Sequence, residues 1–182
     1  MATDFIAKLD KLVADSAGDW RMFIRKLGPI HAQWHAEHNQ GVAKLGFLLF
    51  HWELIQRFVK AGADTGLGGL HKIHPYTEAQ FSAFGQPYTV HATVSAGNVN
   101  AFETFSGDVE AWHNDAHMAV GMAIHHDLMN PRTNVRRPEF WRLHYFINDR
   151  LEEQLRHFGG AGSTPSHVVK QVEANAAAAP LV

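Results

Sequence analysis

The sequence contains no cysteine, and this absence removes several kinds of site from consideration. Disulfides, thiolate zinc sites and iron–sulfur clusters all require cysteine sulfur. A chain without disulfides fits a reducing compartment, so we expect a cytoplasmic protein.

An excess of charge of one sign and long apolar runs are missing as well. The net charge is -2, and the basic residues form no long run. We therefore expect neither nucleic acid nor an anionic membrane as a partner. No apolar stretch approaches the length of a membrane span, and the N-terminal residues predict an amphipathic helix rather than a signal peptide. A homo-oligomer remains an open alternative.

The apolar residues recur mostly at helical spacing, which predicts a mainly α protein. We expect helices over residues 4–16, 19–27, 29–39, 42–61, 108–126 and 138–158, with a break at Gly28-Pro29. Four of them should form an antiparallel bundle. Residues 65–100 are predicted to be an irregular excursion with a short strand or two within 88–95. Residues 1–160 would form one domain, followed by a flexible tail over 161–182.

Histidine is what the chain has in abundance, with fourteen residues, and six of them form a twofold pattern. In each half, two histidines four residues apart precede a third histidine on the next predicted helix. The two sets are His31, His35 and His51, then His113, His117 and His144. Residues four apart share one helix face, and three imidazoles suit copper, zinc or iron. The spacing predicts a pair of three-histidine metal sites.

Two alternatives for the ligands stay open at this point. His38 lies three residues after His35 and could replace His31 or His35. A carboxylate di-iron bundle would need two Glu-x-x-His motifs, and only Glu110 to His113 forms one, which disfavours iron. The remaining histidines match no ligand position, although three of them could line the mouth of the site: His71, His74 and His91.

The stretch GDVEAWHNDAHMAVGM, followed by RRPEFWRLHYFINDR, resembles the second copper-binding region of tyrosinases, catechol oxidases and hemocyanins, the type 3 copper proteins. The first region, IHAQWHAEH with KLGFLLFHWELIQRF, is similar to the hemocyanin arrangement. The resemblance covers residues 28–154. The chain departs from the family at Val42, where tyrosinases would carry a histidine, and at Asn148, where the family usually has an acid and Asp149 follows instead.

The resemblance implies two copper ions held by the six histidines of the pattern. It also implies that Glu110 and Asn114 hold a water that takes the proton of a phenol. The expected function is oxidation by O2 of phenols, catechols or o-aminophenols, with or without ortho-hydroxylation. One compact domain would leave the copper site uncovered, which favours an enzyme. The alternatives are a non-catalytic protein that binds O2 or copper reversibly, and a helical protein that binds zinc or no metal.

Overall fold

The computed structural model describes residues 2–16, 19–38, 45–64, 73–160 and 165–178. The regular elements of this part of the chain are seven α-helices and one short 3-10 helix. In chain order they are α1 (Ala2–Asp15), α2 (Trp20–Glu37), α3 (Leu45–Asp64), α4 (Glu78–Ala83), α5 (Val99–Ala123), η2 (Asn134–Arg136), α6 (Pro138–Gly159) and α7 (Pro165–Ala178). The prediction of a mainly α fold is confirmed.

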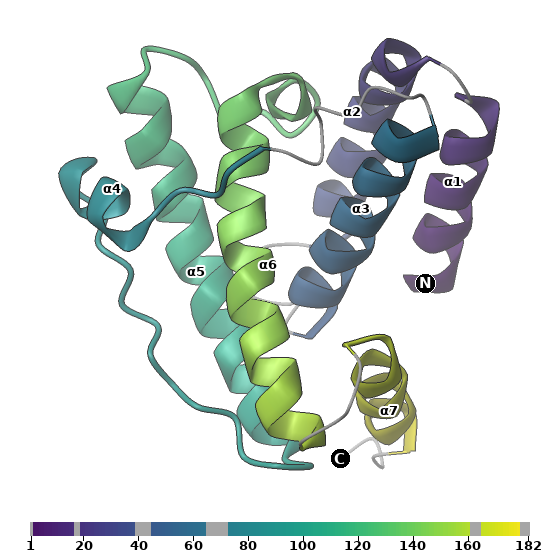
Figure 1. Cartoon of the computed structure of the whole chain (residues 1–182), viewed down its shortest axis with the longest axis vertical. Coiled ribbons are helices and arrows are strands. Elements are labelled where there is room, and N and C mark those ends of the chain that lie inside the picture. Colours follow the sequence, from purple (N-terminus) through teal and green to yellow (C-terminus); the bar gives the residue numbers. More distant parts are fainter. Residues whose placement is uncertain (1, 17–18, 39–44, 65–72, 161–164, 179–182) are drawn as a thin grey trace.

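Two antiparallel helix pairs, α2 with α3 and α5 with α6, form the bundle (Figure 1). Helix α3 packs against both α5 and α6 and so joins the pairs. Helix α1 lies along the outer side of α2 and α3, and α7 lies against one end of α6 and α5. None of the helices described here combines the length and the apolar character needed to cross a membrane.

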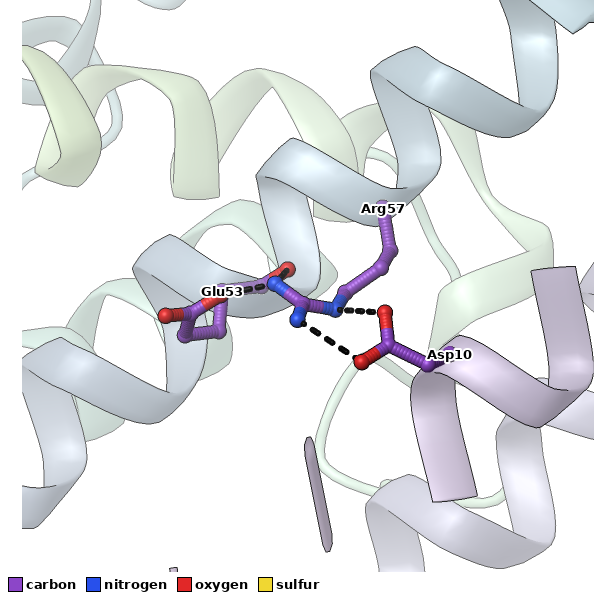
Figure 2. A network of polar contacts seen from close by, with 3 residues as sticks. All are labelled: Asp10, Glu53 and Arg57. Carbon is purple, nitrogen blue, oxygen red and sulfur yellow. Dashed lines mark hydrogen bonds and ion pairs between the residues drawn. The ribbon is translucent and has the colours of Figure 1, made fainter. Parts of the chain in front are cut away.

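An ion network fastens α1 to α3. The guanidinium of Arg57 donates to Asp10 through Nε and Nη2, at 3.1 and 3.3 Å, and also binds Glu53 one turn earlier on its own helix (Figure 2). Paired contacts of this kind restrict the orientation of both side chains. They fix how α1 sits on α3 at a position where Arg57 is largely shielded from solvent.

Helix α5 begins earlier than its sequence pattern predicts. Asn98 caps it by accepting a hydrogen bond from the backbone N–H of Ala101 at 3.0 Å. The helix then runs through Gly107, where a Cβ would meet nothing within 4 Å. A glycine in a helix interior costs only about 1 kcal/mol relative to alanine, so the apolar residues before it, such as Phe102 and Phe105, keep the extra turns helical by being buried.

The predicted break at Gly28-Pro29 is wrong, because α2 continues through both residues. Proline removes one helix hydrogen bond. The burial of Leu27, Gly28 and His31 on the same stretch outweighs that loss.

No strand forms within 88–95, so the prediction of a short strand or two in this segment is wrong. This segment is held by side chains of the bundle instead. Trp112 Nε1 donates to the carbonyl of Pro87 at 3.0 Å, and the backbone N–H of Val94 donates to Gln154 Oε1 at 2.8 Å. A lone extended segment has no partner strand for its backbone groups, so these side chains satisfy them.

The expected tail is helical over α7. Val168, Val169 and Val172 are buried there, and α7 packs on α6. The alanines of this segment have high helix propensity, and the three valines give the helix an apolar face.

The segment between α5 and α6 lies directly against α2. A Cβ on Gly28 would stand 2.0 Å from the backbone oxygen of Arg132, so only glycine permits this approach. The same contact brings Pro131, the residue before Arg132, close to α2.

We expect Gly28→Ala to lower the free energy of unfolding by about 1–3 kcal/mol, since the added methyl group would push two backbones apart. Gly107→Ala is the matched control, a helix glycine with open space, and should be neutral or stabilising. Urea denaturation of both variants measures the difference. Equal effects of the two substitutions would contradict the close packing at Gly28.

Candidate metal centre

The six histidines of the twofold pattern meet in the interior as two groups of three. His31 and His35 come from α2 and His51 from α3, whereas His113 and His117 come from α5 and His144 from α6. Within each group, one ring nitrogen of every member lies within 4.8 Å of the others. We call these groups the first and the second triad. Each has the ligands for one metal ion, and among the described residues neither group includes a carboxylate.

The two triads are in contact with each other. The rings of His51 and His144 are stacked with their centroids 5.0 Å apart, and His51 lies 5.7 Å from His113. His31 faces His144 at 6.5 Å. Ions held by the two groups would therefore be neighbours rather than isolated sites.

Backbone carbonyls orient one histidine of each helix pair. His51 Nδ1 and His144 Nδ1 each lie 2.7 Å from the carbonyl oxygen four residues earlier, that of Phe47 and that of Phe140. Carbonyl oxygens only accept, so each Nδ1 carries the proton and donates. This leaves both Nε2 atoms as lone-pair donors directed away from the helix, the usual arrangement of a metal-binding histidine.

A third ring, that of His31, is oriented by a residue from the other half of the chain. His31 Nδ1 donates to the carbonyl of Pro131 at 2.8 Å. Pro131 lies in the segment that Gly28 allows to approach α2. A residue from between α5 and α6 thus determines which nitrogen of His31 is left for a metal.

Two phenylalanines, Phe47 and Phe140, complete the arrangement. The ring of Phe47 packs 4.4 Å from His51 and 4.8 Å from His113 of the opposite triad. The ring of Phe140 packs 3.9 Å from His144 and 5.2 Å from His31 of the opposite triad. The signal was present in the sequence as a Phe-x3-His spacing in both FLLFH and FWRLH.

The donor geometry fits metal ions. In the first triad, His31 Nε2 and His35 Nε2 are 3.1 Å apart, and in the second, His113 Nε2 and His144 Nε2 are 3.1 Å apart. Two nitrogens bound to one tetrahedral ion at about 2.0 Å would be separated by about 3.3 Å. His51 Nε2 is buried with no hydrogen-bond partner, a costly state that a bound ion would relieve.

Burial keeps the imidazoles neutral. Burial, with a smaller contribution from a neighbouring imidazole in each case, lowers the pKa of His35 to about 4 and the pKa of His117 to about 3. The pKa values of the other four, His31, His51, His113 and His144, also lie well below the ordinary 6.5, with burial again the largest cause. Neutral imidazole is the form that binds metals.

A cavity of about 440 Å³ gives access to both triads. His35 lines it from the first triad, and His113 and His117 line it from the second. The remaining walls are Asn114, Leu128, Met129, Pro131 and Asn134. The centre therefore combines buried ligands with an open side.

The other predicted residues have clear positions. His38 does not join the first triad, since its Nδ1 donates to the Trp34 carbonyl at 2.9 Å and its ring stacks on Trp34. Asn114 lines the cavity, and Glu110, one turn earlier on α5, is buried. Asp149 is exposed, so the orienting partner of His144 is the Phe140 carbonyl. Exposed His74 and His91 are not among the residues of the cavity wall, and His71 lies outside the described residues.

No family of known proteins, no characterised protein and no solved structure matches this chain in comparisons of sequence and fold.

The lowered pKa values predict a pH-dependent stability of the metal-free protein. Below about pH 6.5 the unfolded histidines bind protons, whereas the six rings of the folded triads stay neutral. The unfolded state then holds more protons, so the free energy of unfolding should fall steadily from pH 7 to pH 5. Urea denaturation at a series of pH values measures this. Ions bound at the triads should raise the stability without flattening the profile, because the native rings carry no proton with or without metal. A flat profile without metal would contradict the burial of neutral imidazoles.

Proposed function

We propose that the protein is a binuclear copper oxidoreductase of the type 3 copper kind, which uses O2 to oxidise small phenols, catechols or o-aminophenols. The observation that carries the proposal is the pair of three-imidazole groups in mutual contact, opening onto one cavity. The resemblance of the two histidine regions to that family agrees with the same assignment.

The donor set favours copper over the other metals that bind imidazole. Nitrogen-only sites bind divalent copper more strongly than zinc or iron. Di-iron centres of helical bundles use several carboxylates, and the two triads contain histidine alone among the described residues. A structural zinc site is closed by four protein ligands, whereas each group here offers three and faces a cavity. Copper, once bound, would carry electrons from the substrate to O2.

The cavity suits a small aromatic substrate. Ligand pockets have volumes of roughly 300–1,000 Å³, and this one, at about 440 Å³, falls at the lower end. Leu128, Met129 and Pro131 offer apolar surface to a ring, and Asn114 offers an amide beside His113 and His117. An aromatic ring against the apolar wall would direct its hydroxyl group toward the histidines.

Glu110 and Asn114 are suited to removing the proton of that hydroxyl group. They are four residues apart and share one face of α5; Asn114 lines the cavity, and Glu110 is buried one turn earlier. Phenols ionise near pH 10, so a phenol needs a base to react as phenolate at neutral pH. In this proposal the amide of Asn114 orients a water, and the carboxylate of Glu110 accepts the proton through it.

Metal content per chain tests the copper pair directly. After loading with copper and removal of the excess, the wild-type protein should retain two ions per chain. His51→Ala and His113→Ala should each lose about one, because each removes a ligand of a different triad. His38→Ala, at the C-cap of α2, is the matched control and should keep both ions. Circular dichroism establishes that each variant is helical.

Other metal contents would overturn the proposal. One ion, zinc in preference to copper, or no retained metal would each exclude a copper pair. Two retained coppers without turnover of any phenol or catechol would favour a reversible O2- or copper-binding protein instead.

The role of the two α5 residues has its own test. Glu110→Gln should lower kcat for a monophenol by about 100-fold or more, the usual scale for a lost general base. Its copper content should stay unchanged, and the acid limb of its pH–rate profile should disappear. Asp115→Asn, an exposed neighbour on the same helix, is the control and should leave the rate unaltered. Equal activity of both variants at every pH would refute proton transfer to Glu110.

A further inference from the structure

The exposed large apolar side chains of the described residues are all methionines, and all three gather in one place. Met118, Met122 and Met129 are 49%, 65% and 49% exposed. They line a surface pocket of about 330 Å³ at the C-terminal end of α5, together with the exposed histidines His125 and His126. Single exposed apolar residues need no explanation, but three of one type in one pocket do. We call this the methionine pocket.

The backbone of the methionine pocket is held in place. Met118 and Met122 are one turn apart on α5 and therefore share a face. The following turn is fastened to the helix by the N–H of His126, which donates to the Gly121 carbonyl at 3.0 Å. A Cβ on Gly121 would stand 2.8 Å from the His126 oxygen, so glycine permits this approach. Asp127 Oδ1 then accepts from the N–H of Met129 at 2.8 Å, which fixes the third methionine.

The side chains of the pocket suit one class of ligand. Thioether sulfur is a soft donor and selects Cu(I) among the common cellular metals, and imidazole binds copper as well. Leucine would provide the same apolar surface without sulfur, so a purely hydrophobic contact does not account for methionine at all three positions.

The methionine pocket shares a wall with the cavity of the metal centre. His117, Leu128 and Met129 line both spaces. His117 belongs to the second triad. An ion bound by the exposed thioethers would be separated from the cavity of the metal centre only by this shared wall.

We propose that Met118, Met122 and Met129, with His125 and His126, bind Cu(I) at the surface and pass it across Met129 and His117 to the second triad. Binding at the surface stands on the methionine pocket alone. The transfer step rests on the proposed copper pair.

Silver(I), a redox-inert substitute for Cu(I), tests the binding step on the full-length protein. With 13C-labelled methionine methyl groups, added Ag(I) should shift the NMR signals of Met118, Met122 and Met129. The signal of Met22, on α2, is the internal control and should stay in place. Single Met→Leu variants assign the signals, and this exchange conserves volume at exposed positions, so the fold should be kept. Unshifted signals from the three methionines would overturn the surface site, whatever the triads bind.

Loading kinetics test the transfer step separately. Copper delivered as a Cu(I)–bicinchoninate complex should reach the triads several-fold more slowly in the Met118→Leu, Met122→Leu, Met129→Leu triple variant than in wild type or Met22→Leu. The final copper content should be equal in all three proteins. Equal loading rates would overturn the transfer step, and failure of all proteins to retain copper would refute the copper pair while leaving the Ag(I) result intact.

Discussion

Six neutral imidazoles, five of them buried and that of His35 partly buried, meet in one helical interior and are the constraint on which this structure depends. A buried polar group without a partner costs about 1–3 kcal/mol. Each ring nitrogen therefore either has a partner or lowers the free energy of unfolding. Three rings meet backbone carbonyls through Nδ1, those of His31, His51 and His144. The Nε2 atom of His31 then lies 3.1 Å from His35 Nε2, and that of His144 lies 3.1 Å from His113 Nε2. The spacing of α2, α3, α5 and α6 follows from bringing these rings together.

Both triads contain the same local arrangement, a phenylalanine one turn before a histidine, and each copy contacts the other triad. Phe47 and Phe140 each supply a carbonyl to the histidine one turn later and a ring to a histidine of the opposite triad. An aromatic shell of this kind excludes water and keeps the imidazoles uncharged. The two triads are thus packed against each other through aromatic rings that contact histidines of both.

The sequence carried enough information for the helices that hold the histidines and for the grouping of the histidines, because both depend on local spacing. Residues four apart on a helix share a face wherever the helix lies, so His31 with His35 and His113 with His117 could be paired without a structure. The errors came from tertiary contacts. Burial keeps α2 continuous through Pro29, side chains replace strand pairing near Val94, and packing on α6 orders α7. The Pro131 carbonyl could not be predicted, since no spacing relates it to His31 one hundred residues earlier.

The Pro131 carbonyl also determines the order in which the parts of the first triad can form. Helices α1 to α3 contain every ligand of the first triad, yet the ring of His31 acquires its orienting partner only when the segment after α5 reaches α2 beside Gly28. The N-terminal half of the chain, which is synthesised first, therefore lacks the orienting partner of His31 until the second half folds. A first triad with all its rings oriented requires the segment after α5 to be in place, which would couple any metal binding there to the folding of both halves.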